Sequence, residues 1–461
     1  MWKAMVLALS VTLLFVAGPR LHGPALDSFA LVHVSIIDVN AGMVRPGMTV
    51  LVAGDRIAEV GPAEQLSVPA GARVIDATGK FLIPGLWDMH VHWYDKQSLK
   101  LFTANGVTGV RQMFGYPVHL EWRRELEAGS LAGPRMAMAS PIIDGPRPFW
   151  PDSIAVSNPE EGRKAVQKVK KWGADFVKVY SYLPRDAYFA IAEESRLGHI
   201  PFAGHVPWSV SAAEASDAGQ RSIEHLTGVL LACSAQEAEI RNKIPQATPF
   251  TGRAGIEARA IQTYDEKKAR ALFERFIKNG TWQCPTLTVL RSSAYLDDKD
   301  FRDDRRLKYM PAQVRQRWER REESRFGNRN AASNDALAKA IYSRYLELVG
   351  AMNRAGVQII AGTDTGNPYC FPGFSLHDEL GLLVKSGLTA AEALRTATIN
   401  PARYLGVEDR LGTVEKGKFA DLVLLEANPL DDIHNTQRIT AVVQGGQLLD
   451  RKALDKMLGQ P

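Results

Sequence analysis

The chain has 461 residues, of which 45% are hydrophobic, and its formal net charge at pH 7 is only +5. A chain of this length and ordinary apolar content can bury a large core. Basic residues are interspersed with acidic ones, and no zinc-finger spacing, glycine-rich phosphate loop or aromatic RNA-binding motif occurs in the sequence, so nucleic acid is not expected as a partner.

The first 25 residues have the features of an export signal. A short basic start at residues 1–3 precedes an almost wholly apolar stretch at 4–17, and small residues such as Gly18 and Ala25 offer cleavage points. The apolar stretch is short for a membrane span, and no lipid-accepting cysteine follows it. We expect a soluble protein that is exported to the periplasm or secreted, with no stable membrane span after signal removal. An uncleaved N-terminal anchor is the alternative.

Short β-rich runs follow the signal. Runs of β-branched and apolar residues at 31–38 and 48–52 are separated by Gly-Asp and Gly-Pro turns, which predicts strands. Runs at 421–425 and 439–446 repeat this character near the C-terminus.

The stretch from 81 to 92 is apolar and β-like, and it ends in His90-Val91-His92. Strand alternation sends residues i and i+2 to the same face, so both imidazoles can reach a single metal ion. Two solvated or core histidines would be favoured if the motif stood alone. The Pro-Gly pair within the stretch, and the ligand-type residues at later strand ends, favour a metal site.

The segment 173–180 closes a predicted helix and opens a strand in which Lys178 lies among apolar and β-branched neighbours. Buried lysine is uncommon unless it is paired or chemically altered. A depressed pKa would leave the Lys178 amine nucleophilic, able to take up carbon dioxide as a carbamate whose two oxygens can bridge two cations. A lysine that extends from the strand end to solvent is the alternative.

Two further runs, 201–206 and 221–226, each carry one histidine near the end, His205 and His225. Either histidine alone would be interpreted as structural. Because a helix-like segment separates the two runs, they are predicted to be consecutive strands of one parallel barrel. Such barrels keep their catalytic groups at the strand ends.

A long polar region follows the predicted strand at 282–287. It is rich in Arg, Glu, Asp and Ala and has helical periodicity at 336–342, which predicts a helical insertion at about 291–350. An insertion of this length has more residues than a crossover between parallel strands needs. Since the loops that follow barrel strands build the active site, the insertion can overhang it as a lid. A solvated helical excursion without a catalytic role is the alternative.

A buried-type strand is predicted at 356–366, and it ends in Asp364. An isolated Thr-Asp pair would be assigned to a turn or a helix cap. In the company of the histidines, Asp364 is predicted to be both a metal ligand and a catalytic residue. Six residues are thus of the right kinds to hold two metal ions: His90, His92, Lys178, His205, His225 and Asp364.

The three cysteines have no metal-binding spacing. In an oxidising compartment Cys233 and Cys284 could pair. Buried, unpaired thiols are favoured, with Cys370 as the third.

Taken together, these motifs resemble the amidohydrolase superfamily, and more narrowly its prolidase-like and imidazolonepropionase-like branch. The resemblance extends from about residue 32 to about residue 449. It is carried by Pro-Gly-Leu-Trp-Asp-Met-His-Val-His, Gly-Ala-Asp-Phe-Val-Lys, the Gly-His and Glu-His strand ends, Ala-Gly-Thr-Asp-Thr, Asn400-Pro401-Ala402 and the motif at 411–423.

The resemblance implies an α/β fold, a (β/α)8 TIM-like barrel with a small composite β-sandwich domain formed by the N- and C-terminal segments. We place the barrel at 81–411 and the composite domain at 26–80 and 412–461, after a signal peptide at 1–25. The role of the composite domain is expected to be structural.

The resemblance also implies how the metals are shared. His90, His92 and Asp364 would bind one ion, and His205 and His225 the other. Lys178, as its carbamate, would bridge the two. Zinc is the expected metal, with manganese and cobalt left open. Imidazolonepropionases carry one ion and use no bridging lysine, so Lys178 points to the two-metal, prolidase-like side.

The expected reaction is hydrolysis of an amide C–N bond by a metal-bridging hydroxide, with Asp364 moving the proton from the nucleophile to the departing nitrogen. Relatives of the branch hydrolyse dipeptides, N-acyl amino acids or cyclic amides. We favour a linear amide with a free carboxylate, a dipeptide or an N-acyl amino acid. The alternatives are a cyclic amidase of the imidazolonepropionase type, an esterase, lactonase or organophosphate hydrolase on the same two metals, and a metal-free binding descendant of the fold. A homo-oligomer is left open.

Five residues are candidates for contacts with the substrate because they follow predicted strands and face the pocket mouth. Arg111 is a candidate for bidentate binding of a carboxylate, and a salt-bridged barrel arginine is the alternative. The others are Tyr116, Tyr180, Tyr182 and Asn367.

Overall fold

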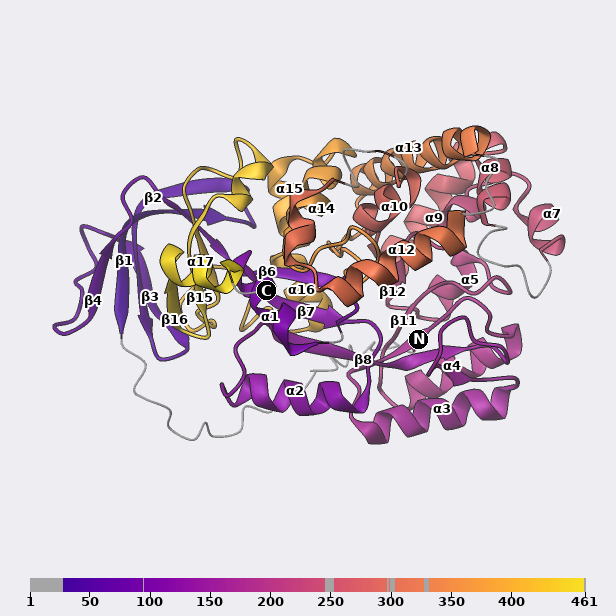
Figure 1. Ribbon diagram of the computed structural model, residues 1–461, viewed down its shortest axis with the longest axis horizontal. Helices are drawn as coiled ribbons and strands as arrows, with labels where there is room; N and C mark the ends of the chain where they lie inside the picture. Colours follow the sequence, from indigo (N-terminus) through magenta and orange to yellow (C-terminus); the bar gives the residue numbers. More distant parts are fainter. Residues whose placement is uncertain are drawn as a thin grey trace, which may run out of the picture.

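The computed structural model describes residues 28–93, 95–244, 253–296, 298, 303–326 and 331–459. Two sheets organise these residues, one built from both ends of the chain and one forming a parallel barrel between them (Figure 1). The predicted export signal lies outside the described residues. Within them, no helix is both long and apolar enough to cross a membrane.

The first sheet runs in the order β16-β15-β14-β5-β1-β2-β3, with β4 paired to β1. Its strands are β1 (Phe29–Asp38), β2 (Met43–Ala53), β3 (Arg56–Pro62), β4 (Arg73–Asp76), β5 (Phe81–Pro84), β14 (Leu422–Leu425), β15 (Ile439–Gln444) and β16 (Gln447–Asp450). Apolar residues of both chain ends, such as Leu31 and Leu422, share one buried core. The backbone N of Ile57 in β3 donates to the backbone O of Lys418 at 2.9 Å, so β3 contacts the segment that precedes β14. The N- and C-terminal segments therefore form one domain, in agreement with the predicted composite β-sandwich.

The barrel contains seven parallel strands in the order β6-β7-β8-β10-β11-β12-β13. They are β6 (Leu86–Val91), β7 (Val107–Gln112), β8 (Arg135–Asp144), β10 (Phe176–Val179), β11 (Phe202–Gly204), β12 (Ser222–Glu224) and β13 (Trp282–Cys284), and a short β9 (Ile154–Ala155) pairs with β8. The predicted pairing of the two histidine strands is confirmed, since β11 and β12 are parallel neighbours.

The eighth barrel position is occupied by a segment that makes isolated bridges instead of a strand. Ile359 bridges Gln283 of β13, and Thr365 bridges Val91 of β6, both in parallel. The strand predicted at 356–366 is therefore in the expected place without forming a regular ladder. The positive φ of Asp364, 59°, interrupts the extended backbone there. The result is a nearly closed barrel of the predicted class.

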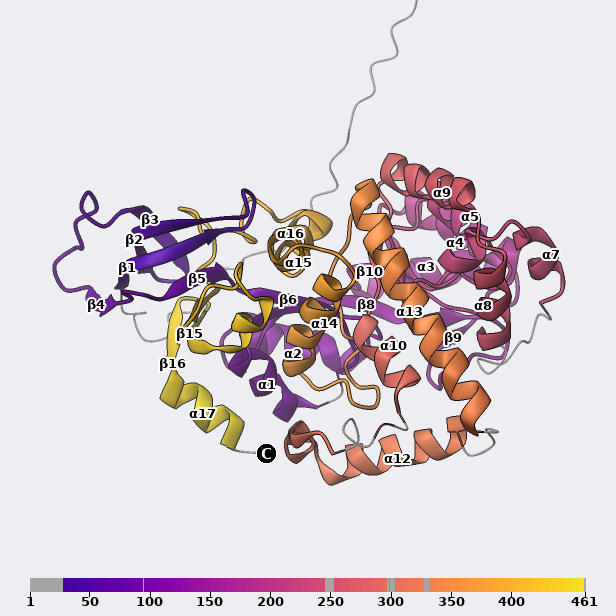
Figure 2. The same cartoon turned by 90° about the horizontal axis from the view of Figure 1, so that it is seen from above.

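Helices connect the strands, and those of the central part of the chain cover the barrel (Figures 1 and 2). They are α1 (Leu99–Ala104), α2 (Pro117–Glu127), α3 (Pro159–Trp172), α4 (Arg185–Leu197), α5 (Ala212–Asp217), α6 (Val229–Ala232), α7 (Glu237–Asn242), α8 (Arg253–Gln262), α9 (Glu266–Asn279), α10 (Leu287–Ala294), α12 (Ala312–Phe326), α13 (Ala331–Ala355), α14 (Phe374–Lys385), α15 (Ala390–Thr396), α16 (Ile399–Leu405) and α17 (Arg451–Gly459), with 3-10 turns η1 (Lys96–Ser98), η3 (Arg305–Tyr309) and η4 (Ile433–Gln437). Ser211 and Glu214 form a capping box at the start of α5, the helix predicted between the two histidine strands.

The stretch predicted as one strand from 81 to 92 is two strands in different sheets. β5 belongs to the composite sheet and β6 begins the barrel, so the domain boundary falls at Gly85 and not before Phe81. A Cβ at Gly85 would lie 2.0 Å from Oγ1 of Thr108. Only glycine lets the chain pass this close to β7, which explains why the break occurs at this residue.

The predicted insertion at 291–350 separates into two parts. α13, which contains the predicted helical run 336–342, packs against α8, α9, α10 and α14 as an ordinary crossover helix would. The true surplus is η3 and α12. Figure 2 shows α12 along the outer edge of the molecule, beyond α10.

Candidate active site

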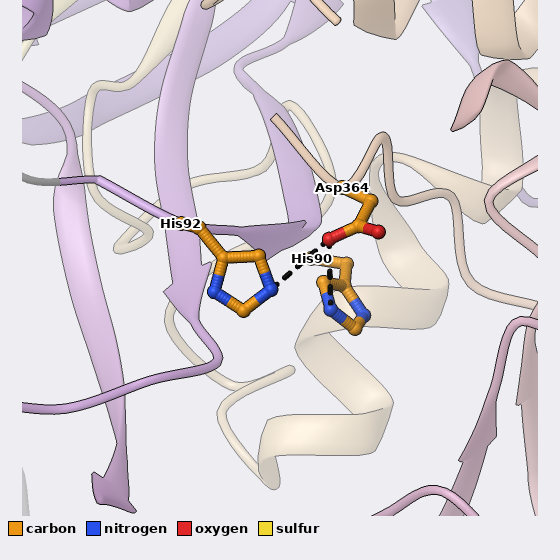
Figure 3. A group of neighbouring side chains, drawn as sticks. All are labelled: His90, His92 and Asp364. Carbon is orange, nitrogen blue, oxygen red and sulfur yellow. Dashed lines mark ion pairs between the residues drawn. The ribbon is translucent and has the colours of Figure 1, made fainter. Parts of the chain in front are cut away.

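His90, His92 and Asp364 form one compact group at the ends of β6 and the eighth barrel segment (Figure 3). Nε2 of His92 lies 3.0 Å from Oδ1 of Asp364, and Nε2 of His90 lies 3.4 Å from the same oxygen. His90 is completely buried, whereas the side chain of His92 is 16% exposed. The i, i+2 spacing thus turns both imidazoles to one carboxylate.

His225 and His205 extend this group across the barrel. Nε2 of His225 lies 3.8 Å from Oδ2 of Asp364, and its ring centroid is 4.5 Å from that of His90. The His205 ring is 4.9 Å from that of His225. Because each histidine follows the end of its own strand, β11 and β12 bring both side chains to the same rim of the barrel.

Lys178 is the sixth predicted residue, and it lies in β10 with only 1% of its surface exposed. Burial lowers the pKa of its amine to about 8, although the nearby carboxylates Glu224 and Asp364 raise that pKa. Its Nζ has no hydrogen-bond partner among the described residues. The alternative of a lysine that reaches solvent therefore does not fit its position.

A polar group holds the second ring nitrogen of three of the histidines. Nδ1 of His90 donates to Oε2 of Glu224 at 2.8 Å. Nδ1 of His205 lies 2.8 Å from Oγ of Ser181, and Nδ1 of His225 lies 2.6 Å from Oγ1 of Thr286. Such contacts fix the ring orientation in metal sites.

Part of the backbone around the site is strained. Asp364, His225 and Thr286 have φ values of 59°, 57° and 49°, in the left-handed region that residues other than glycine rarely adopt. Residues held in this way commonly lie at functional sites, where the surrounding structure enforces the conformation. Here the left-handed conformation orients two predicted metal ligands, Asp364 and His225, and also Thr286, whose hydroxyl contacts His225.

Arg111 is not at the pocket mouth, so its predicted contact with a substrate carboxylate does not fit the structure. It is completely buried, and its Nη2 donates to Oε1 and Oε2 of Glu224 at 2.9 and 2.8 Å. Its Nε and Nη1 donate to Met89 O at 2.6 Å and to the hydroxyl of Tyr404 at 2.8 Å. Arg111 points into the barrel because the Glu224 carboxylate lies there. The alternative from the sequence, a salt-bridged barrel arginine, therefore fits the structure.

Glu224 is the functional residue that our sequence reasoning missed. It is completely buried and joins Arg111 to His90. Burial alone would raise the pKa of Glu224, but Arg111 and His90 hold it well below its ordinary value, so the carboxylate is charged. The sequence did offer a signal for Glu224. This acidic residue directly precedes His225 in a buried strand, and acidic residues are rarely buried unless they are paired.

The remaining substrate candidates divide into two groups. Tyr180 stacks on His205 with ring centroids 3.9 Å apart, and Asn367 donates to the backbone O of Asp364 at 3.0 Å, so both adjoin the site. Tyr116 packs against the cluster that contains Tyr180. Tyr182 lies farther out and contacts Phe149.

A cavity of about 880 Å³, measured out to the solvent, opens beside His92. The segment 309–318, which is part of the predicted insertion, forms one of its walls. The insertion therefore contributes to the surroundings of the site, and its role as a lid stays a prediction.

The residues of the site fit a divalent metal. Nε2 of His90 and Nζ of Lys178 are buried and have no hydrogen-bond partner in the described part of the chain, a condition that native proteins avoid unless the atom has another partner. Imidazole nitrogens and a carboxylate oxygen are the donor set that zinc takes.

The cysteines play no part in a disulfide, since Cys233, Cys284 and Cys370 are all buried and free.

Known proteins resemble this chain in sequence and in fold. The model of the amidohydrolase family matches residues 81–449. Among curated proteins, ochratoxinase from Aspergillus niger is 36% identical over 118 residues, which are 24% of this chain and 24% of the relative. The matched region thus spans about a quarter of that relative.

Solved structures match over nearly the whole chain. Bottromycin amidohydrolase has a TM-score of 0.76 and 26% identity over 93% of this chain and 88% of its own. A prolidase-like protein from Bifidobacterium longum has a TM-score of 0.67 and 25% identity over 95% of this chain and 99% of its own.

Proposed function

Because the chain belongs to the amidohydrolase family and is a hydrolase acting on C–N bonds, we propose that it cleaves the amide bond of a dipeptide or an N-acyl amino acid with the help of two divalent metal ions. One observation carries this proposal: four histidines and Asp364 cluster at one rim of the barrel, close enough to the buried Lys178 for Asp364 to act on its charge. Among the described residues, Nε2 of His90 and Nζ of Lys178 have no hydrogen-bond partner.

We assign one ion to His90, His92 and Asp364 and the other to His205 and His225, with the carbamate of Lys178 between them. Zinc is the proposed metal because imidazole predominates among the ligands. When bound, such a pair of ions lowers the pKa of a water held between them and polarises the carbonyl of the substrate.

The protein's own groups supply the proton transfer. Oδ1 of Asp364 faces His90 and His92, and Oδ2 faces His225, so the carboxylate lies at the centre of the group. We propose that it accepts the proton of the attacking water and gives it to the departing nitrogen. This second transfer is needed because an amide nitrogen leaves poorly without a proton.

The decisive test is a substrate screen on the zinc-loaded protein. Dipeptides and N-acyl amino acids are compared with esters of the same acyl group, and kcat/KM is measured for each pair. We expect turnover of the amides. Hydrolysis of esters, lactones or phosphotriesters alone would replace the proposal with one of those activities, and hydrolysis of cyclic amides alone would indicate an imidazolonepropionase-type reaction.

Replacing Lys178 with methionine tests the carbamate. The methionine side chain is similar in length to that of lysine and is well tolerated in buried positions, so the fold should persist. With 13C-labelled bicarbonate, the unaltered protein should give a carbamate carbonyl signal in 13C NMR, and the variant should lack it. We also expect bound zinc to fall from about two ions per chain, because the bridge is gone.

The matched control is Lys164→Met on α3, where the lysine side chain is 70% exposed. It should leave the 13C signal and the zinc content unchanged. If Lys178→Met kept two zinc ions per chain and full activity, the bridging role of Lys178 would be wrong.

A further inference from the structure

The cavity beside His92 begins at the active site. His92, Thr365 and Gly366 line it, and the last two directly follow Asp364 in the chain. Its other walls come from η1 and α1, from the segment 309–318 and from the loop at 370–372.

The walls of this cavity are mainly apolar and aromatic. The side chains that give it this character are Leu101, Phe102, Tyr309, Met310, Val314 and Trp318. Leu101, Phe102, Met310 and Trp318 are otherwise buried, so these walls are packed and preformed. The charged residues of the lining are Asp95, Lys100 and Arg317. Asp95 is already occupied as the cap of η1, where it accepts from Ser98 N at 2.9 Å.

Trp318 holds the outer wall against the site. Its Nε1 donates to the backbone O of Gly366 at 3.2 Å, and its ring contacts those of Tyr369 and Phe371 at centroid distances of 5.9 and 5.7 Å. α12 is therefore fixed to the loop that follows Asp364. This makes the cavity a built pocket and not a gap beneath a solvated helix.

We propose that this cavity binds a large apolar side chain, preferably aromatic, on the amine half of the substrate. The proposal rests on the function proposed above, because Asp364 must reach the departing nitrogen. The amine half must then lie against Asp364, and the cavity is lined by His92, whose Nε2 is 3.0 Å from the Asp364 carboxylate. The substrate class is thus N-acyl or N-aminoacyl derivatives of phenylalanine-like and leucine-like amino acids.

Two substrate series test which half enters the cavity. In the first, the acyl group is acetyl and the amino acid is Ala, Leu or Phe; in the second, the amino acid is Ala and the acyl group grows from acetyl to phenylacetyl. We expect kcat/KM to rise at least about 10²-fold from Ala to Phe in the first series and to change little in the second, since a single methylene in a fitted pocket already contributes about 10-fold or more. Preference confined to the acyl series would overturn the proposal.

Filling the cavity tests its location. Val314→Trp should lower kcat/KM for N-acetyl-phenylalanine towards the value for N-acetyl-alanine, because Val314 lines the cavity. Gln316→Trp, on the same helix but exposed and outside the lining, is the control and should change neither value. Equal selectivity in Val314→Trp and the unaltered protein would exclude this cavity.

A labelling experiment separates this proposal from the proposed function. N-acetyl-p-benzoylphenylalanine is irradiated with the zinc-loaded protein, and the crosslinked residues are mapped by peptide mass spectrometry, a readout that needs no turnover. We expect adducts within 97–102 or 309–318. Adducts there without hydrolysis of any amide would support the cavity and refute the amidase, whereas hydrolysis with adducts elsewhere would refute the cavity alone.

Discussion

Replacing Asp364 with asparagine should lower kcat by about 10²–10⁴-fold, the range that a positioned general acid–base contributes. The amide has the same shape as the carboxylate and can still approach His90 and His92, but it cannot take up a proton. Asp364 is also held in place by its strained backbone, with a φ of 59°, which asparagine tolerates well. The loss should therefore be chemical and not structural.

Three measurements distinguish these causes. kcat is determined at saturating N-acyl amino acid, zinc content by elemental analysis, and Tm by calorimetry. Asp186→Asn is the control, since Asp186 is exposed on α4, and it should change none of the three. A Asp364→Asn variant with near-normal kcat would remove Asp364 from proton transfer, and one that has lost both activity and Tm would point to a structural role.

The sequence predicted the parts of this protein that follow from local pattern. Alternation in a strand is enough to place His90 and His92 side by side, and the helix-like segment between the two histidine strands is enough to predict α5. The composite sheet, in contrast, joins strands separated by more than 300 residues, and it was expected only through the family resemblance.

What the sequence left undecided depends on contacts between distant residues. Arg111 and Glu224 are 113 positions apart, and no periodicity in either strand reveals that they face each other inside the barrel. The break at Gly85 depends in the same way on the nearby side chain of Thr108. Both are properties of packing, which is decided by the assembled fold and not by the segment.

Replacing Glu224 with glutamine should lower the free energy of unfolding by about 3–5 kcal/mol, the usual effect of removing one partner of a buried ion pair. The side chains of Arg111 and Glu224 are both completely buried, and glutamine leaves the guanidinium without a countercharge. His90 would also lose its carboxylate partner at 2.8 Å, so metal affinity should fall by about 10–100-fold. Urea denaturation and zinc titration measure the two effects.

A second variant separates stability from positioning. The double variant Arg111→Met, Glu224→Leu removes both members of the Arg111–Glu224 ion pair, so much of the lost stability should return, because apolar replacements of buried ion pairs are often neutral or better. Zinc affinity should stay low, since His90 still lacks a partner for Nδ1. The control Glu193→Gln breaks the exposed pair with Arg163 at 3.4 Å and should change stability by less than about 1 kcal/mol. Recovery of both properties in the double variant would show that Glu224 only neutralises Arg111 and does not orient His90.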